Sequence, residues 1–138
     1  MDLARIVPYI GAVSCLVLAI VLSAPYLLVN SEAMLLGSYY GAGPVGIAGA
    51  VFLSLLGVVI FLSGERGQAD PELIAGIMAV VGVVLFGMTV LWAVSITDTI
   101  VFSFPSEYSW IEYHPMLSAG TSAIVAATGG LYAWAVLR

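Results

Sequence analysis

The side chains best suited to chemistry gather in one short segment, residues 98–114. This segment holds three carboxylates, five aromatic rings and the only histidine of the chain. Its ionisable side chains are Asp98, Glu107, Glu112 and His114. Carboxylates and imidazole can bind a metal, but these four lack the spacing of a metal-ligand motif, and a turn at Pro115 would expose them on the surface. We therefore expect no metal ligand here, and a small-molecule site is one interpretation of the segment.

Two other interpretations rest on the aromatic residues of the same segment. These residues are Phe102, Phe104, Tyr108, Trp110 and Tyr113. Trp and Tyr favour the headgroup region of a bilayer, which predicts rings lying at a membrane interface. Aromatic anchors with a charged rim are also typical of a protein contact surface. The segment therefore has three interpretations: a small-molecule site, a membrane interface, and partner contact through these five rings.

The remaining chain offers little that could catalyse a reaction. Cys15 is the only cysteine, so neither an intrachain disulfide nor thiol-disulfide exchange is expected. Ser14, Ser54, Ser95 and Ser122 lie in apolar stretches without a Lys or His to act as a base. The same stretches lack the ionisable residues of ion-coupled transporters and the paired histidines of a diheme bundle. We expect a protein that is not an enzyme and holds no cofactor.

The composition indicates a membrane protein. Of the 138 residues, 62% are hydrophobic and 8% are charged, whereas about a quarter of the residues are charged in a soluble domain. Lipid must cover what polar side chains cannot. The net charge is −5, with three Arg and no Lys, which argues against nucleic-acid binding because phosphate neutralisation needs clustered bases.

Four uncharged apolar runs are long enough, or nearly so, to cross a bilayer core that needs about 20 helical residues. They cover residues 6–29, 45–62, 73–97 and 116–137. Asp70-Pro71-Glu72 is a helix-start signature before the third run, and Ser63-Gly64 predicts the end of the second. The second run is shortest, so we expect it to begin earlier, within 41–44. The sequence thus predicts a single all-α membrane domain, with four transmembrane helices in an antiparallel up-down bundle.

The arginines predict the orientation. With four spans, Arg5, Arg66 and Arg138 fall on the same side of the membrane. The positive-inside rule then places both termini in the cytoplasm and residues 98–114 outside. We expect a multi-pass protein of the cell membrane.

Small residues four apart predict how the helices pack, because close approach of backbones drives association in lipid. Such residues share a helix face. The ladders include Gly46 and Ala50 in the second span. The fourth span has two adjacent ladders, one of Ser118, Ser122, Ala126 and Gly130 and the other of Ala119, Ala123 and Ala127. We expect these faces to turn inward.

In composition and span layout, the whole chain resembles the uncharacterised small four-span membrane proteins of halophilic archaea. That resemblance implies no activity and no site residue. The leading hypothesis is a non-catalytic membrane subunit or scaffold that acts through helix packing, with other membrane subunits or copies of itself as partners in the lipid bilayer. The alternative is a channel or passive permease, whose pore would be formed by Ser, Thr and Gly helix faces.

Overall fold

Four long helices make up almost all of the chain that the computed structural model describes. The described residues are 3–28, 37, 39–41, 47–65, 70–96 and 110–137. The helices are α1 (Leu3–Leu28), α3 (Ala48–Glu65), α4 (Pro71–Ser95) and α6 (His114–Leu137). Within these ranges there is no strand. The described part of the chain is therefore all-helical, as predicted.

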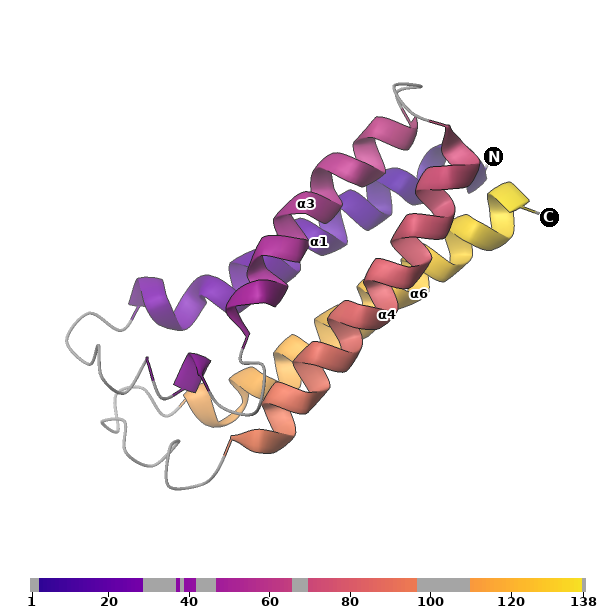
Figure 1. The fold of residues 1–138 in the computed structure, drawn as a ribbon. Helices are drawn as coiled ribbons and strands as arrows, with labels where there is room; N and C mark the ends of the chain where they lie inside the picture. Colours follow the sequence, from indigo (N-terminus) through magenta and orange to yellow (C-terminus); the bar gives the residue numbers. More distant parts are fainter. Residues whose placement is uncertain are drawn as a thin grey trace.

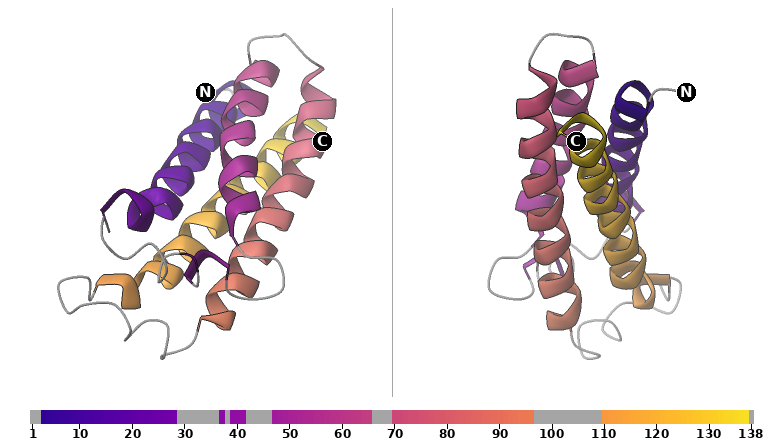
Figure 2. Two further views of the ribbon diagram at one scale, coloured as in Figure 1. Left: turned by 60° about the vertical axis from the view of Figure 1, so that its left-hand side comes forward. Right: turned by 90° about the vertical axis from the view of Figure 1, so that its right-hand side faces the viewer.

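The helices lie side by side, and neighbours run in opposite directions (Figure 1). α1 packs against α3 and α6, and α4 packs against the same two helices. The start of α1 and the end of α6 lie at one end of the molecule, together with the end of α3 and the start of α4 (Figure 2). We call this the terminal end, and the other the cluster end.

The start of α4 confirms the signature read from the sequence. Asp70 is the N-cap, and its side chain accepts a hydrogen bond from the Glu72 backbone N–H at 3.1 Å. Pro71 occupies the first helical position, where its missing N–H costs nothing. The helix ends at Ser95, because Ile96 is extended (φ −74°, ψ 123°).

The second helix differs from the expectation at both ends. α3 begins at Ala48 rather than in 41–45, and it continues through Ser63 and Gly64 to Glu65. The Ser63 hydroxyl donates to the Val59 carbonyl at 2.9 Å, which is a contact made within a continuing helix. Gly64 stays helical instead of ending the helix. The 18 residues of α3 span about 27 Å at 1.5 Å per residue.

Three of the helices are long and apolar enough to cross a membrane. These stretches are Arg5–Leu27, Pro71–Ser95 and His114–Leu137. In α3 the apolar stretch is shorter, Ala48–Ser63. The outward faces of all four helices carry large apolar side chains, among them Phe52, Val83 and Ile124. Such a surface suits lipid or another apolar helix.

Glycines allow α4 and α6 to approach until their backbones touch. A Cβ added at Gly82 would lie 2.8 Å from the Ala126 Cα, and one at Gly129 would lie 2.5 Å from the Met78 carbonyl oxygen. On the other side of the bundle, a Cβ at Gly57 would lie 2.7 Å from the Cys15 sulfur. The helices therefore meet through small residues, as expected of packing in a membrane.

The inward face of α6 follows a different spacing from the one expected. Ser118 and Ser122 are buried, and Ala126 contacts α4, but Gly130 is exposed with nothing within 4 Å of an added Cβ. Steps of four residues turn a helix by about 400°, so a ladder of three such steps rotates about 120° away from its starting face. Gly129 faces α4 instead. In α3, Ala50 is buried, while Gly46 lies outside the described residues.

Candidate functional site

Five aromatic side chains form the most polar packed region of the described chain, at the cluster end. We call them the His114 cluster: Tyr39, Tyr40, Trp92, Trp110 and His114. Tyr39 and Trp92 are fully buried, and His114 is 4% exposed. Trp92 comes from the last turns of α4, His114 is the first residue of α6, and the two tyrosines precede α3.

Both ring nitrogens of His114 have protein partners. Nε2 lies 2.5 Å from the Val21 carbonyl oxygen, and Nδ1 lies 2.6 Å from the Tyr39 hydroxyl. A carbonyl can only accept, so the proton is on Nε2. In the neutral form of the imidazole, Nδ1 accepts from the Tyr39 O–H. This arrangement leaves His114 no ring nitrogen for a metal or a substrate.

Pro25 explains why the Val21 carbonyl needs a partner from outside α1. In an α-helix this carbonyl would accept from the N–H of residue 25, but proline has none. An unpaired carbonyl inside an apolar bundle costs free energy. The His114 Nε2–H supplies the missing donor.

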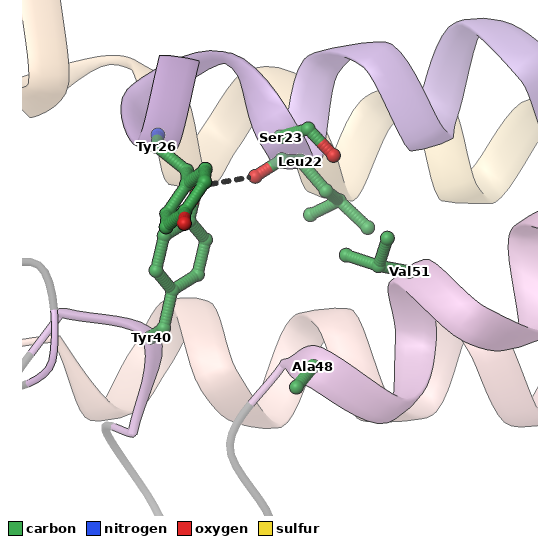
Figure 3. A pocket seen from close by; sticks show the side chains of 6 residues that line it. All are labelled: Leu22, Ser23, Tyr26, Tyr40, Ala48 and Val51. Atoms are coloured by element: carbon green, nitrogen blue, oxygen red, sulfur yellow. Dashed lines mark hydrogen bonds between the residues drawn. The ribbon is translucent and has the colours of Figure 1, made fainter. Parts of the chain in front are cut away.

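Tyr40 bridges the next pair of backbone hydrogen-bonding groups in the same helix. Its hydroxyl donates to the Leu22 carbonyl at 2.7 Å and accepts from the Tyr26 N–H at 3.1 Å. Residues 22 and 26 are the pair that an uninterrupted helix would join directly. Figure 3 shows Tyr40 reaching across to Leu22 from the segment before α3. Side chains of other segments thus supply the hydrogen-bond partners for two consecutive carbonyls of α1, those of Val21 and Leu22.

Tyr39 connects this end of α1 to α4. The Trp92 indole N–H donates to the Tyr39 carbonyl at 2.8 Å, and the two rings meet edge to face with centroids 5.2 Å apart. The His114 ring lies edge to face on Trp92 at 5.8 Å and on Trp110 at 6.2 Å. The Tyr40 carbonyl accepts from the Ile47 N–H at 3.0 Å, next to the start of α3. The cluster therefore joins all four helices.

Burial sets the charge state of the two tyrosines. It raises the pKa of Tyr39, and the neighbouring Tyr40 phenol raises it further. Burial also raises the pKa of Tyr40, partly opposed by the Tyr26 N–H bond. Both phenols are neutral near pH 7 and act as hydrogen-bond donors. The described residues hold no group of three or more His, Cys, Asp or Glu side chains that could bind a metal.

Two apolar cavities flank the turn of α1 that the cluster holds. One has a volume of about 320 Å³ and lies between α1 and α3; it is lined by Leu22, Ser23, Tyr26, Tyr40, Ala48 and Val51 (Figure 3). The other, of about 360 Å³, lies between α1 and α6. It is lined by Ile20, Val21, Ala24, Trp110, Tyr113, His114 and Leu117. Linings of this kind suit acyl chains or apolar side chains.

The residues of segment 98–114 that were singled out from the sequence do not form one surface site among the described residues. Trp110 packs on His114, and Tyr113 is exposed at the rim of the second cavity. Glu112 is exposed. The other carboxylates and aromatic residues singled out in that segment lie outside the described residues; they are Asp98, Phe102, Phe104, Glu107 and Tyr108.

His114 corrects an expectation, because it is buried rather than exposed at a surface turn. Sequence reasoning also missed Tyr39, Tyr40 and Trp92 as its companions. One signal was present: Pro25 within an apolar run leaves a carbonyl that a donor from another segment must satisfy.

Comparison with known proteins gives a family but no activity. Neither a curated protein nor a solved structure matches the chain. A family of unknown function, DUF7548, matches residues 1–137. The chain therefore belongs to this family.

Proposed function

We propose that the protein is a non-catalytic integral membrane subunit or scaffold that acts through helix packing, in a larger complex or with copies of itself. In this proposal all four helices cross the membrane. The 27 Å or so spanned by α3 approaches the bilayer core of roughly 30 Å. An even number of crossings puts both termini on one side, and exposed Arg5 favours the cytoplasm.

The outer face of α6 carries the proposal. Small residues three and four apart follow that face: Gly120, Ala123, Ala127 and Gly130. A Cβ added at Gly120 or Gly130 would meet nothing within 4 Å. The opposite face of α6 uses Gly129 to touch α4. Because small residues are where membrane helices approach closely, α6 is suited to pack a second helix on its free face.

The hydrogen bonds of the hydroxyl groups favour a scaffold function and argue against a pore through the single chain. Each buried Ser and Thr hydroxyl of the described residues donates to a carbonyl of its own helix, three or four residues earlier. These bonds join Ser14 to Ile10, Ser54 to Ala50, Thr89 to Leu85, Ser118 to His114, Thr121 to Leu117, Ser122 to Ala119 and Thr128 to Ile124. Hydroxyls used in this way offer little to a passing ion. Among the described residues, no buried side-chain nitrogen or oxygen lacks a partner.

The test is the mass of the gently solubilised native particle, with the chains that co-purify identified. The chain alone has a mass of 14.4 kDa, so we expect a particle of at least twice the chain mass. Gly130→Leu should shift it toward the monomer, because the larger side chain fills the free face of α6. Gly87→Leu is the matched control, since Gly87 is exposed on α4 and an added Cβ there also meets nothing within 4 Å.

Two outcomes would count against the proposal. A monomer at every protein concentration in mild detergent would remove the assembly it requires. Equal effects of the two glycine variants would remove the role given to α6. Ion or solute flux through vesicles containing the protein would favour a pore between protomers instead.

A further inference from the structure

Around Pro25, two consecutive backbone carbonyls of α1 are bonded to side chains of other segments. The Val21 carbonyl has no donor within α1, since residue 25 is proline. The next step is completed through the Tyr40 hydroxyl, which contacts both the Leu22 carbonyl and the Tyr26 N–H. Helices bend where a proline or an inserted side chain interrupts the ladder. At this turn of α1 both occur together.

The groups that hold this turn come from two separate segments. Tyr40 precedes α3, and His114 begins α6. Tyr39, the neighbour of Tyr40 in the chain, links the two segments because its hydroxyl is hydrogen-bonded to the His114 Nδ1. A displacement of either segment therefore removes a hydrogen bond from the end of α1. The bonds of His114 to Val21 and to Tyr39, and of Tyr40 to Leu22 and to Tyr26, thus form one connected set.

The same turn separates the two apolar cavities. Leu22, Ser23 and Tyr26 line the cavity toward α3, while Ile20, Val21 and Ala24 line the one toward α6. Tyr40 is at the wall of the first cavity, and His114 is at the wall of the second. The groups that fix the turn thus also line the open cavity on each side of it.

We propose that residues 26–28 of α1, the segment beyond Pro25, form a latch that turns about this proline. The Tyr40 hydroxyl holds the latch closed by joining the Tyr26 N–H to the Leu22 carbonyl, while His114 fixes the Val21 carbonyl on the other side of the hinge. Loss of the Tyr40 bridge swings the segment outward and widens the cavity toward α3, which Tyr26 and Tyr40 line. The latch is a property of this fold, and it holds whether or not the outer face of α6 binds another helix.

Hydrogen exchange on the full chain in lipid nanodiscs tests the latch. The peptide covering residues 20–28 should exchange by local opening. Tyr40→Phe keeps the ring and removes the bridging hydroxyl with both of its hydrogen bonds, so exchange in this peptide should rise on the order of tenfold or more. Exchange in the middle of α4 should stay unchanged. A matching rise in α4 would show that the variant unfolds as a whole, and it would overturn the latch.

Pro25→Ala provides the decisive comparison. Alanine restores an N–H for the Val21 carbonyl and lets Tyr26 bond directly to Leu22. Exchange of the 20–28 peptide should fall below that of the unchanged protein, and adding Tyr40→Phe should then have little effect. An equally large effect of Tyr40→Phe with and without Pro25 would refute a hinge at this residue.

A distance measurement keeps the proposal testable if exchange is slow throughout. Spin labels at Leu27→Cys and Met116→Cys, two exposed positions, report the separation of the end of α1 from α6 when Cys15 is replaced by Ala. We expect Tyr40→Phe to broaden the distance distribution and Pro25→Ala to narrow it. Identical distributions in all three proteins would overturn the latch.

Discussion

Gly129 and Gly130 allow the packing of α4 on α6 to be measured with two neighbouring substitutions. Each glycine is helical, and each change to Ala raises helix propensity by about 1 kcal/mol. The new methyl group meets very different surroundings. At position 129 it would lie 2.5 Å from the Met78 carbonyl oxygen and 3.4 Å from the Ala79 Cα, and at position 130 it meets nothing within 4 Å.

The contact at position 129 is with backbone, so no side-chain rotation can relieve it. The two helices must separate, and overpacking of this kind costs about 1–3 kcal/mol. The gain in propensity is common to both variants and cancels in their comparison. In the monomer, where the outer face of α6 is free, Gly129→Ala should therefore be less stable than Gly130→Ala by about 1–3 kcal/mol, while Gly130→Ala is at least as stable as the unchanged protein.

Reversible unfolding in mixed detergent micelles, followed by circular dichroism, measures this difference. Gly82→Ala should behave like Gly129→Ala, because its Cβ would lie 2.8 Å from the Ala126 Cα. Equal stability of the 129 and 130 variants would refute the close approach of α4 and α6. Greater loss at position 130 would mean that the inward face of α6 has been assigned to the wrong residues.

Three further predictions concern the His114 cluster. His114→Phe leaves the Val21 carbonyl without a donor and should cost about 1–3 kcal/mol of unfolding free energy; His114→Gln, which keeps an N–H donor, should recover part of it in the same assay, and equal losses would contradict the bond to Val21. Trp92→Phe removes the N–H bond to the Tyr39 carbonyl and should cost about 1 kcal/mol in thermal unfolding; an unchanged unfolding temperature would contradict this bond. The raised pKa of Tyr39 favours the neutral phenol in the folded state. The contribution of this phenol to the free energy of unfolding should therefore be constant below the ordinary tyrosine pKa of about 10 and fall as the pH rises above it. Tyr39→Phe should reduce that alkaline loss, and an unaltered pH profile would contradict the burial of this phenol.

Apolar length and helix-start chemistry made the helices predictable. Uncharged runs mark all four, and Asp70-Pro71-Glu72 marks the start of α4 because each residue acts locally. The ends of α3 were not predictable in the same way. Ser63-Gly64 is compatible with either ending or continuing a helix, and the structure continues it to Glu65.

The candidate site depends on contacts between segments far apart in the chain. Tyr39 and His114 are 75 residues apart, and Val21 and His114 are 93 apart. A period of four selected Gly130, whereas the helix presents Gly129 to α4. An α-helix has 3.6 residues per turn, so a sequence period of four drifts around the helix. Which of two neighbouring glycines faces the partner helix can be decided only when the position of that helix is known.

The bond between His114 and Val21 also sets an order of events during synthesis. Val21 is made 93 residues before its partner, which at about 5–20 residues per second is an interval of roughly 5–20 s. Throughout that interval α1 carries a carbonyl that no part of the nascent chain can satisfy. Water or the translocation machinery must serve as its partner, so the end of α1 settles into its final place only after α6 has begun to emerge. α1 is thus made before α3, α4 and α6 and is completed only after α6 has begun to form.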